Sequence, residues 1–211
     1  MPPKPQASFG KLRPRREKGL SIFSPFRWSW SSCPWEPLLG GGSSLKRADR
    51  DGMATTIAND QPASPGIFEL SIAHKNVPQK RVVVYLGAAE NIRNELTTLV
   101  QDGGELRGFL DHGLKEGHVV WFRVQLKPSV AAATAAKDSA LANYDYAWVN
   151  QPGAKGRSLM LRPEHSCCSG ACCFCGKAKG RVTLREGPPK FLQEKQQSGL
   201  FQMLSGNSRK R

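Results

Sequence analysis

The stretch from Gly66 to Gly87, GIFELSIAHKNVPQKRVVVYLG, constrains the fold of this chain more than any other part of the sequence. Apolar residues give its first segment a strand-like character, and residues 82–86 form a run of β-branched, aromatic and aliphatic side chains, which is typical of strands. Residues 74–81 contain a proline and several basic or amide side chains, which are typical of a loop. The sequence therefore predicts a β-hairpin.

Two segments with helical periodicity follow the hairpin. The first ends at the triplet Asp-Gly-Gly over residues 102–104, and in the second Gly108 and Gly113 lower the helix propensity. The apolar residues that share one face are Ile92, Leu96, Leu99 and Val100 in the first segment and Leu106, Phe109, Leu110 and Leu114 in the second. We expect one regular helix and one short helix that depends on packing.

The end of this region predicts one more strand and one more helix. Residues Val119 to Gln125, VVWFRVQ, form an apolar run that is typical of a strand covered on both faces. Ser129 is a suitable N-cap for an alanine-rich helix over Val130 to Asn143. The order β, β, α, α, β, α predicts an α/β (α+β) domain over residues 65–150, with a small three-stranded sheet flanked by helices.

Several blocks of this domain resemble a known family. Gly66-Ile67-Phe68 and Tyr85-Leu86-Gly87 resemble the two halves of the GIY-YIG nuclease signature. Together with YLGAAENIRNEL and the block Tyr144-Asp145-Tyr146-Ala147-Trp148, they are similar to the GIY-YIG-like domain of the plant EFFECTOR OF TRANSCRIPTION proteins, which are nuclear regulators with cysteine-rich, DNA-contacting repeats. The resemblance covers about Pro65 to Asn150. It implies the same order of elements and a role in transcriptional control.

The resemblance also implies positions for an active site. In the family, a tyrosine from each half-motif, an arginine on the first helix and a metal-holding glutamate on a later helix converge on a scissile phosphate. Tyr85 retains its hydroxyl here, whereas Phe68 replaces the usual first tyrosine. Gly66 and Gly87 are both retained, and a glycine at such positions lets a phosphate backbone approach closely.

The two charged positions are altered. Ten residues after Tyr85, where the family has arginine, this chain has Glu95, whose carboxylate would repel a phosphate. Arg93 lies about 200° away around the same helix. The metal glutamate is expected about two helical turns before Tyr144, where the candidates are Lys137, which cannot ligate a hard cation, and Asp138, which requires a register shift of one residue.

These changes predict a catalytically degenerate domain that acts as a scaffold of a DNA-associated regulator. The alternative is an enzyme, a structure-specific endonuclease that nicks DNA with Mg²⁺ or Mn²⁺. It would use Tyr85, Asp138 and a relocated arginine such as Arg93 or Arg107. His74 in the predicted hairpin loop, His112 within a helix and His118 before a strand offer no other active site.

The net charge of +14 lies outside the predicted domain. Residues 1–50 carry +7, residues 51–150 carry −2 and residues 151–211 carry +9. Basic tails on a nearly neutral domain indicate a polyanionic partner, most simply DNA, although a solvated tail without a specific partner has the same composition. No stretch is long and apolar enough to cross a bilayer, so we expect no membrane partner.

Residues 1–64 show no sustained period and are expected to form a disordered basic tail. One part of this tail is rich in aromatic side chains, namely Phe23, Phe26, Trp28, Trp30 and Trp35. They could stack on bases, dock into a partner or cover the edge of the following domain. The composition also resembles a transit peptide, so a plastid or a mitochondrion is the alternative to the nucleus. Met53 could begin a shorter chain, which would make residues 1–52 dispensable.

Residues 151–211 are expected to form a second basic tail, rich in cysteine. Cys172 and Cys175 form a C-x-x-C motif, and His165 with Cys167 or Cys168 could complete a tetrahedral zinc site. A reduced or lipid-modified cysteine run is the alternative. The candidate DNA contacts in this tail are Lys177, Lys179, Arg181 and Arg185. The terminal Arg209-Lys210-Arg211 is typical of a nuclear localisation signal.

Overall fold

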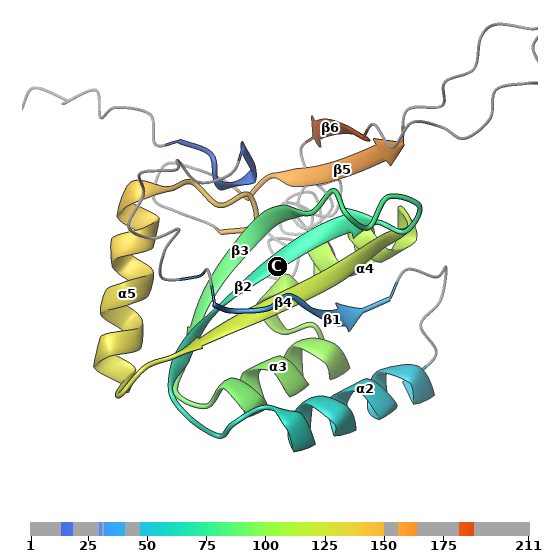
Figure 1. Cartoon of the computed structure of the whole chain (residues 1–211). Helices are drawn as coiled ribbons and strands as arrows, with labels where there is room; N and C mark the ends of the chain where they lie inside the picture. The colour runs from blue at the N-terminus through green and yellow to red at the C-terminus, as the bar shows by residue number, and fades with distance from the viewer. Residues whose placement is uncertain are drawn as a thin grey trace, which may run out of the picture.

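The computed structural model describes residues 14–18, 30, 32–40, 47–149, 156–163 and 182–187. Its centre is an antiparallel sheet with the strand order β1-β4-β2-β3 (Figure 1). The strands of this sheet are β1 (Glu36–Leu39), β2 (Gly66–His74), β3 (Val82–Ala89) and β4 (His118–Leu126). The helices are α2 (Arg47–Asp60), α3 (Ile92–Gln101), α4 (Arg107–Lys115) and α5 (Val130–Asn143), with short 3-10 turns η1 (Arg16–Lys18) and η2 (Gly104–Leu106). Within the described part of the chain, no helix is both long and apolar enough to cross a bilayer.

The predicted order of elements is confirmed from β2 to α5. The β2–β3 hairpin is followed by α3, whose buried residues are the four that the periodicity selects. Asn91 caps its start, and Gly103 follows its end in the left-handed region at φ 76°. Ser129 caps α5 as predicted, because its side chain accepts a hydrogen bond from the backbone of Ala132 at 3.2 Å.

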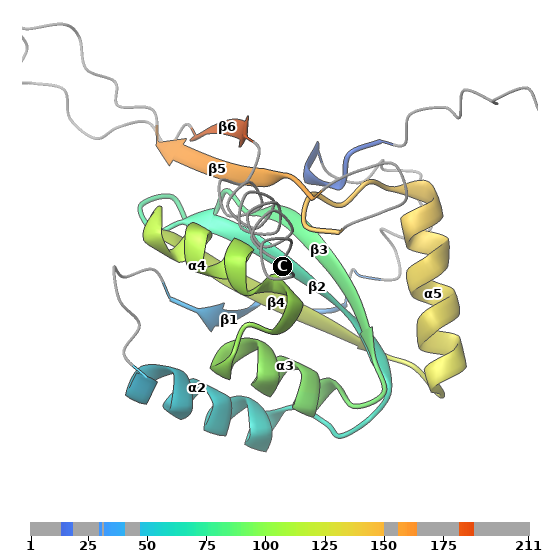
Figure 2. The ribbon, with the colours of Figure 1, turned by 180° about the vertical axis from the view of Figure 1, so that it is seen from behind.

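The alternation of side chains along the strands divides the interior into two cores, one on each face of the sheet. Figure 2 shows α3 and α4 in front of the sheet, with α2 beside α3. Phe68, Leu70 and Phe122 point to this face and pack with α2, α3, α4 and Trp148. On the opposite face, Ile67 packs with α5, Trp30 and Tyr146. The prediction that β4 is covered on both faces holds in part, since the second face of β4 is only half-buried.

The N-terminal boundary at residue 65 is wrong. The prediction of disorder over residues 1–64 fails for β1, which pairs with β4, and for α2, which lies beside α3 (Figures 1 and 2). The sheet consequently has four strands rather than three. Both elements lack a clear period: β1 is four residues long and contains a proline, and among the side chains described in α2 only Ala54 and Ile57 are buried. Of the predicted aromatic patch, Trp30 is 1% exposed and covers the domain, whereas Phe23, Phe26 and Trp28 lie outside the described residues.

The C-terminal boundary at residue 150 is also too early. Strands β5 (Ser158–Pro163) and β6 (Val182–Gly187) form an antiparallel hairpin that crosses above the main sheet in Figure 1. Leu159 and Leu161 of β5 are buried in the core on the α2–α4 face. The folded unit therefore includes chain on both sides of residues 65–150.

Two buried histidines lie at the end of β2 and the start of β4, and one of them, His118, is hydrogen-bonded to this hairpin. His74 is the last residue of β2 and is buried, rather than lying in the hairpin loop as predicted. His118 begins β4, is fully buried, and its Nε2 accepts a hydrogen bond from the backbone N–H of Leu161 at 3.0 Å. Burial lowers the pKa of His118; the carbonyl oxygen of Leu161, 3.3 Å from Nε2, opposes this shift, and the nearby His74 adds to it. The fold therefore favours neutral His118.

We expect the free energy of unfolding to fall as the pH drops below about 6.5, the unfolded-state pKa of histidine. Below that pH, His118 binds a proton in the unfolded chain but stays neutral in the folded one. The free energy of unfolding therefore falls as the pH drops from about 6.5 to the lowered pKa of folded His118, and it does not fall further on account of this group at lower pH. The contribution of one such group is at most about 1.4 kcal/mol per pH unit. Urea titrations of His118→Gln should show a flatter pH dependence than those of His112→Gln. Equal slopes in the two variants would contradict this assignment.

Candidate functional site

The two half-motifs meet where β2 and β3 pair, with Phe68 opposite Gly87. The Phe68 and Tyr85 ring centroids are 5.8 Å apart, and a Cβ atom at position 87 would overlap the Phe68 ring. At position 66 a Cβ atom would lie 2.8 Å from the carbonyl oxygen of Gln125. Both glycines are buried, so here they permit close packing of side chain and backbone within the protein. Phe68 itself is 1% exposed and belongs to the core.

Tyr85 is only partly buried and lies in an acidic environment. Burial raises the pKa of Tyr85 to about 12, and the charges of Glu105 and Glu95 add to the shift. Loss of hydration and the charge of Glu105 likewise raise the pKa of Glu95, and Lys137 acts in the opposite direction. The electrostatic surroundings of Tyr85 thus keep its hydroxyl protonated and disfavour a second anion.

Helix α5 presents Lys137, not Asp138, toward this site. Lys137 is half-buried and interacts electrostatically with Glu95, whereas Asp138 is exposed, about 100° further around the helix. An ammonium group cannot ligate a divalent cation, and no group of three His, Cys, Asp or Glu side chains suited to a metal occurs among the described residues. The residues at the family's metal position therefore do not fit Mg²⁺ or Mn²⁺.

The candidate replacement arginines do not restore the missing cation. Arg93 lies on α3, but its Nε donates a hydrogen bond to the carbonyl oxygen of Gln61 at 2.8 Å. Arg107 begins α4 and is highly exposed, with Asp111 3.8 Å away. Compared with the family pattern, the site has a carboxylate in place of the arginine and an ammonium in place of the metal carboxylate.

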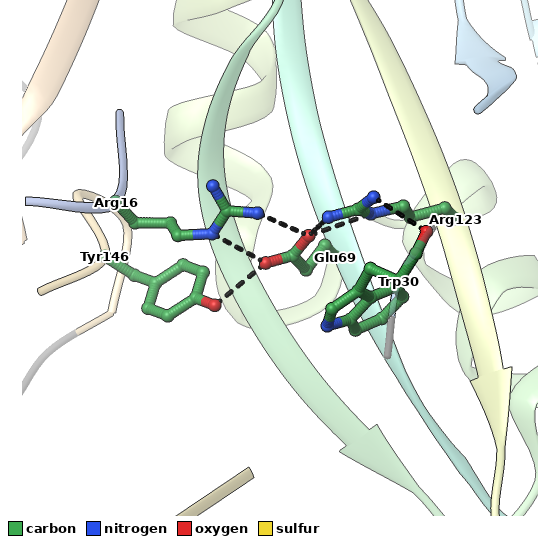
Figure 3. Close-up of polar contacts among 5 residues, drawn as sticks. All are labelled: Arg16, Trp30, Glu69, Arg123 and Tyr146. Atoms are coloured by element: carbon green, nitrogen blue, oxygen red, sulfur yellow. Dashed lines mark hydrogen bonds and ion pairs between the residues drawn. The ribbon is translucent and has the colours of Figure 1, made fainter. Parts of the chain in front are cut away.

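A second charged cluster lies on the opposite face of the sheet, around Glu69 of β2. We call Glu69, Arg16, Arg123 and Tyr146 the Glu69 clasp (Figure 3). Arg16 donates to both carboxylate oxygens, at 3.0 and 3.1 Å, and the Tyr146 hydroxyl donates at 2.8 Å. Arg123 of β4 forms an ion pair from the other side through Nη2, and its Nε donates at 2.9 Å. Four segments distant in the sequence are thereby joined on one carboxylate.

The clasp is almost closed to solvent. Glu69 is completely buried, Arg16 is 4% exposed and Tyr146 is 1% exposed. Burial lowers the pKa of Arg16, but the charges and hydrogen bonds of Glu69 and Tyr146 together outweigh this effect and the pKa is raised. Burial also raises the pKa of Tyr146, and the neighbouring Glu69 raises it further. The surplus positive charge lies against aromatic rings, because the Arg123 guanidinium is 4.5 Å from the ring centres of both Trp30 and Trp35. The Glu69 clasp therefore stabilises the fold and does not form a site that is accessible to a ligand.

The clasp was not predicted from the sequence, although two features could have indicated it. Glu69 and Arg123 are charged residues inside otherwise apolar strand segments, and such residues are buried only when paired. The sequence around Arg16 gives no comparable indication that this residue is buried and paired. The block Tyr144–Trp148 has a structural explanation, since Tyr146 closes the clasp and Trp148 stacks on Phe109 with ring centroids 5.5 Å apart.

The remaining predicted site residues lie in the C-terminal region. Arg185 is exposed on β6. The other predicted DNA contacts, Lys177, Lys179 and Arg181, lie outside the described residues, as do the predicted zinc ligands His165, Cys168, Cys172 and Cys175. The zinc site therefore stays a prediction.

The fold and the half-motifs define the class of protein. The chain matches the family model described as GIY-YIG domain-containing protein over residues 32–160, more than half of its length, and it belongs to that family. It is similar to Protein EFFECTOR OF TRANSCRIPTION 2 from Arabidopsis thaliana, with 24% identity over 176 residues. The match covers 70% of this chain but only 35% of the relative. No solved structure matches the chain.

Proposed function

We propose that this protein is a DNA-associated regulator of transcription whose GIY-YIG domain binds without cleaving. The observation that carries the proposal is the reversed charge pattern at the site, with Glu95 beside Tyr85 and Lys137 facing Glu95. A phosphate would meet a carboxylate where the family supplies an arginine. The site therefore lacks both the metal ligand and the phosphate-binding arginine that metal-assisted phosphodiester cleavage uses in the family.

The association with DNA is supported by charge and by similarity. Residues 1–50 and 151–211 carry the whole positive excess of the chain, and such segments attract a phosphate backbone in a strongly salt-dependent way. The role in transcription extends the name of the similar Arabidopsis protein to this chain. We further propose a nuclear location, based on the basic C-terminus, and zinc binding by the cysteine cluster.

A nuclease assay tests the absence of cleavage. We expect purified full-length protein, incubated with supercoiled plasmid or branched duplexes and Mg²⁺ or Mn²⁺, to give no nicked product above a no-enzyme control. Electrophoretic mobility shift on the same DNA should show binding that weakens steeply with salt.

The endonuclease alternative makes the opposite prediction. Metal-dependent nicking that disappears in Tyr85→Phe would show that the altered site still cleaves and would overturn the proposal. Nicking that persists in Tyr85→Phe would indicate a contaminating nuclease. The matched control is Tyr144→Phe, which removes a hydroxyl at the end of α5, in the core on the opposite face of the sheet from Tyr85.

A further inference from the structure

Beyond the Glu69 clasp, indole rings and guanidinium groups alternate across the same face of the sheet. Arg123 lies between Trp30 and Trp35, and Arg81 lies between Trp35 and Trp121. The Arg81 guanidinium carbon is 6.0 Å from the ring centre of Trp35 and 5.2 Å from that of Trp121. We call these three residues the Arg81 stack.

The two arginines differ in what neutralises them. Arg123 is 11% exposed and paired with Glu69. Arg81 is exposed, and within the described part of the chain it forms no ion pair. A guanidinium held over indole rings by cation–π contacts keeps N–H donors that can bind oxygen acceptors. Arg81 is therefore held in place with its donors available to an external anion.

The loop that precedes Arg81 adds further positive charge. Lys75 and Lys80 are exposed in the β2–β3 loop, and residues 75–81 contain no acidic side chain. Backbone hydrogen bonds shape this loop: Lys75 donates to Gly117 at 3.2 Å, and Lys80 donates to Val77 at 3.1 Å. Three cations thus lie on a short, internally bonded loop beside partly exposed indoles.

This surface is separate from the site at the half-motifs. Trp121 and Arg123 alternate along β4 with Val120 and Phe122, which face the core on the α2–α4 side. Tyr85 packs against that core, so the Arg81 stack lies on the opposite face of the sheet from Tyr85.

We propose that Arg81, together with Lys75 and Lys80, binds the phosphodiester backbone of DNA. The proposal rests on the DNA association proposed above and names the folded surface that provides it. Planar guanidinium groups bind phosphate oxygens through two parallel N–H donors, and a stacked arginine loses less side-chain entropy when it does so. Contacts of this kind do not read base sequence.

Charge reversal in the full-length chain tests the proposal. We expect Arg81→Glu to weaken binding to a fluorescent DNA duplex by about tenfold or more at moderate salt. Arg81→Gln should reduce the slope of the logarithm of the binding constant against the logarithm of the salt concentration by about one. The matched control is Arg107→Glu, which reverses an exposed arginine on α4 and should change affinity by less than about threefold. Thermal melts identify any variant that fails to fold. In that case Arg81→Lys is tested instead; it keeps the positive charge but loses the planar guanidinium group, and it should lower the affinity for DNA.

The outcomes separate this inference from the proposed function. If the wild-type chain binds DNA and the Arg81 and Arg107 variants weaken binding equally, the Arg81 stack is not the DNA contact, while the proposed function stands. If the wild-type chain binds neither duplex nor single-stranded DNA at low salt, both proposals fail. If Arg81→Glu still binds DNA but no longer binds a phosphorylated peptide that the wild-type chain binds, the Arg81 stack serves another phosphate ligand and the inference is overturned.

Discussion

Glu69→Gln is expected to lower the free energy of unfolding by about 3–5 kcal/mol, because it leaves two buried guanidinium groups without a counter-charge. Arg16 and Arg123 both depend on this carboxylate, and Arg16 is almost fully enclosed. Domains of this size are stable by only about 5–15 kcal/mol, so the loss would bring the variant close to unfolding at room temperature. Urea or guanidinium titrations measure the change.

The control for this prediction removes a carboxylate of the same type from the surface. Glu105→Gln changes an exposed residue and should alter the free energy of unfolding by no more than about 0.5 kcal/mol. Similar small losses in both variants would mean that water or a neighbouring group compensates the arginines and that the Glu69 clasp adds little stability.

A chain that begins at Met53 is expected not to fold cooperatively. It lacks β1, whose Leu38 and Leu39 are completely buried, and it lacks Arg16 and Trp30, which cover the second face of the sheet. Burying one large apolar side chain contributes about 1.5–3 kcal/mol, so the loss of three of them, together with the Arg16 ion pair, is comparable to the whole expected stability of the domain. Circular dichroism and thermal melts of residues 53–211 provide the measurement.

A smaller truncation serves as the comparison for this chain. Removal of residues 1–13 leaves every described residue in place and should preserve the cooperative transition. If residues 53–211 melt at the same temperature as the full chain, the N-terminal segment is an accessory and the hypothesis that residues 1–52 are dispensable is correct.

The sequence predicted the elements whose pattern is local. The β2–β3 hairpin, α3 and the Ser129 cap of α5 each have strong signals of period, turn or cap within a few residues. Strand β1 could not be predicted in the same way, because four residues with a proline have no period of their own. Their place in the sheet depends on a partner, β4, that lies far along the chain.

The site was predictable in its residue types but not in its geometry. Counting from Tyr85 identified Glu95 at the arginine position, and the structure places its charge near the tyrosine. Counting backward from Tyr144 left Lys137 and Asp138 as alternatives, since a shift of one residue on a helix changes which side chain faces inward. Only the packing of α5 distinguishes them.

The Glu69 clasp also has a consequence for synthesis on the ribosome. The segment containing Arg16 emerges before its partners Glu69, Arg123 and Tyr146, the last of which comes near the end of the domain. Strand β1 likewise waits for β4. A nascent chain therefore completes the Glu69 clasp only after helix α5 and Tyr146 have left the exit tunnel, so the domain closes late in synthesis.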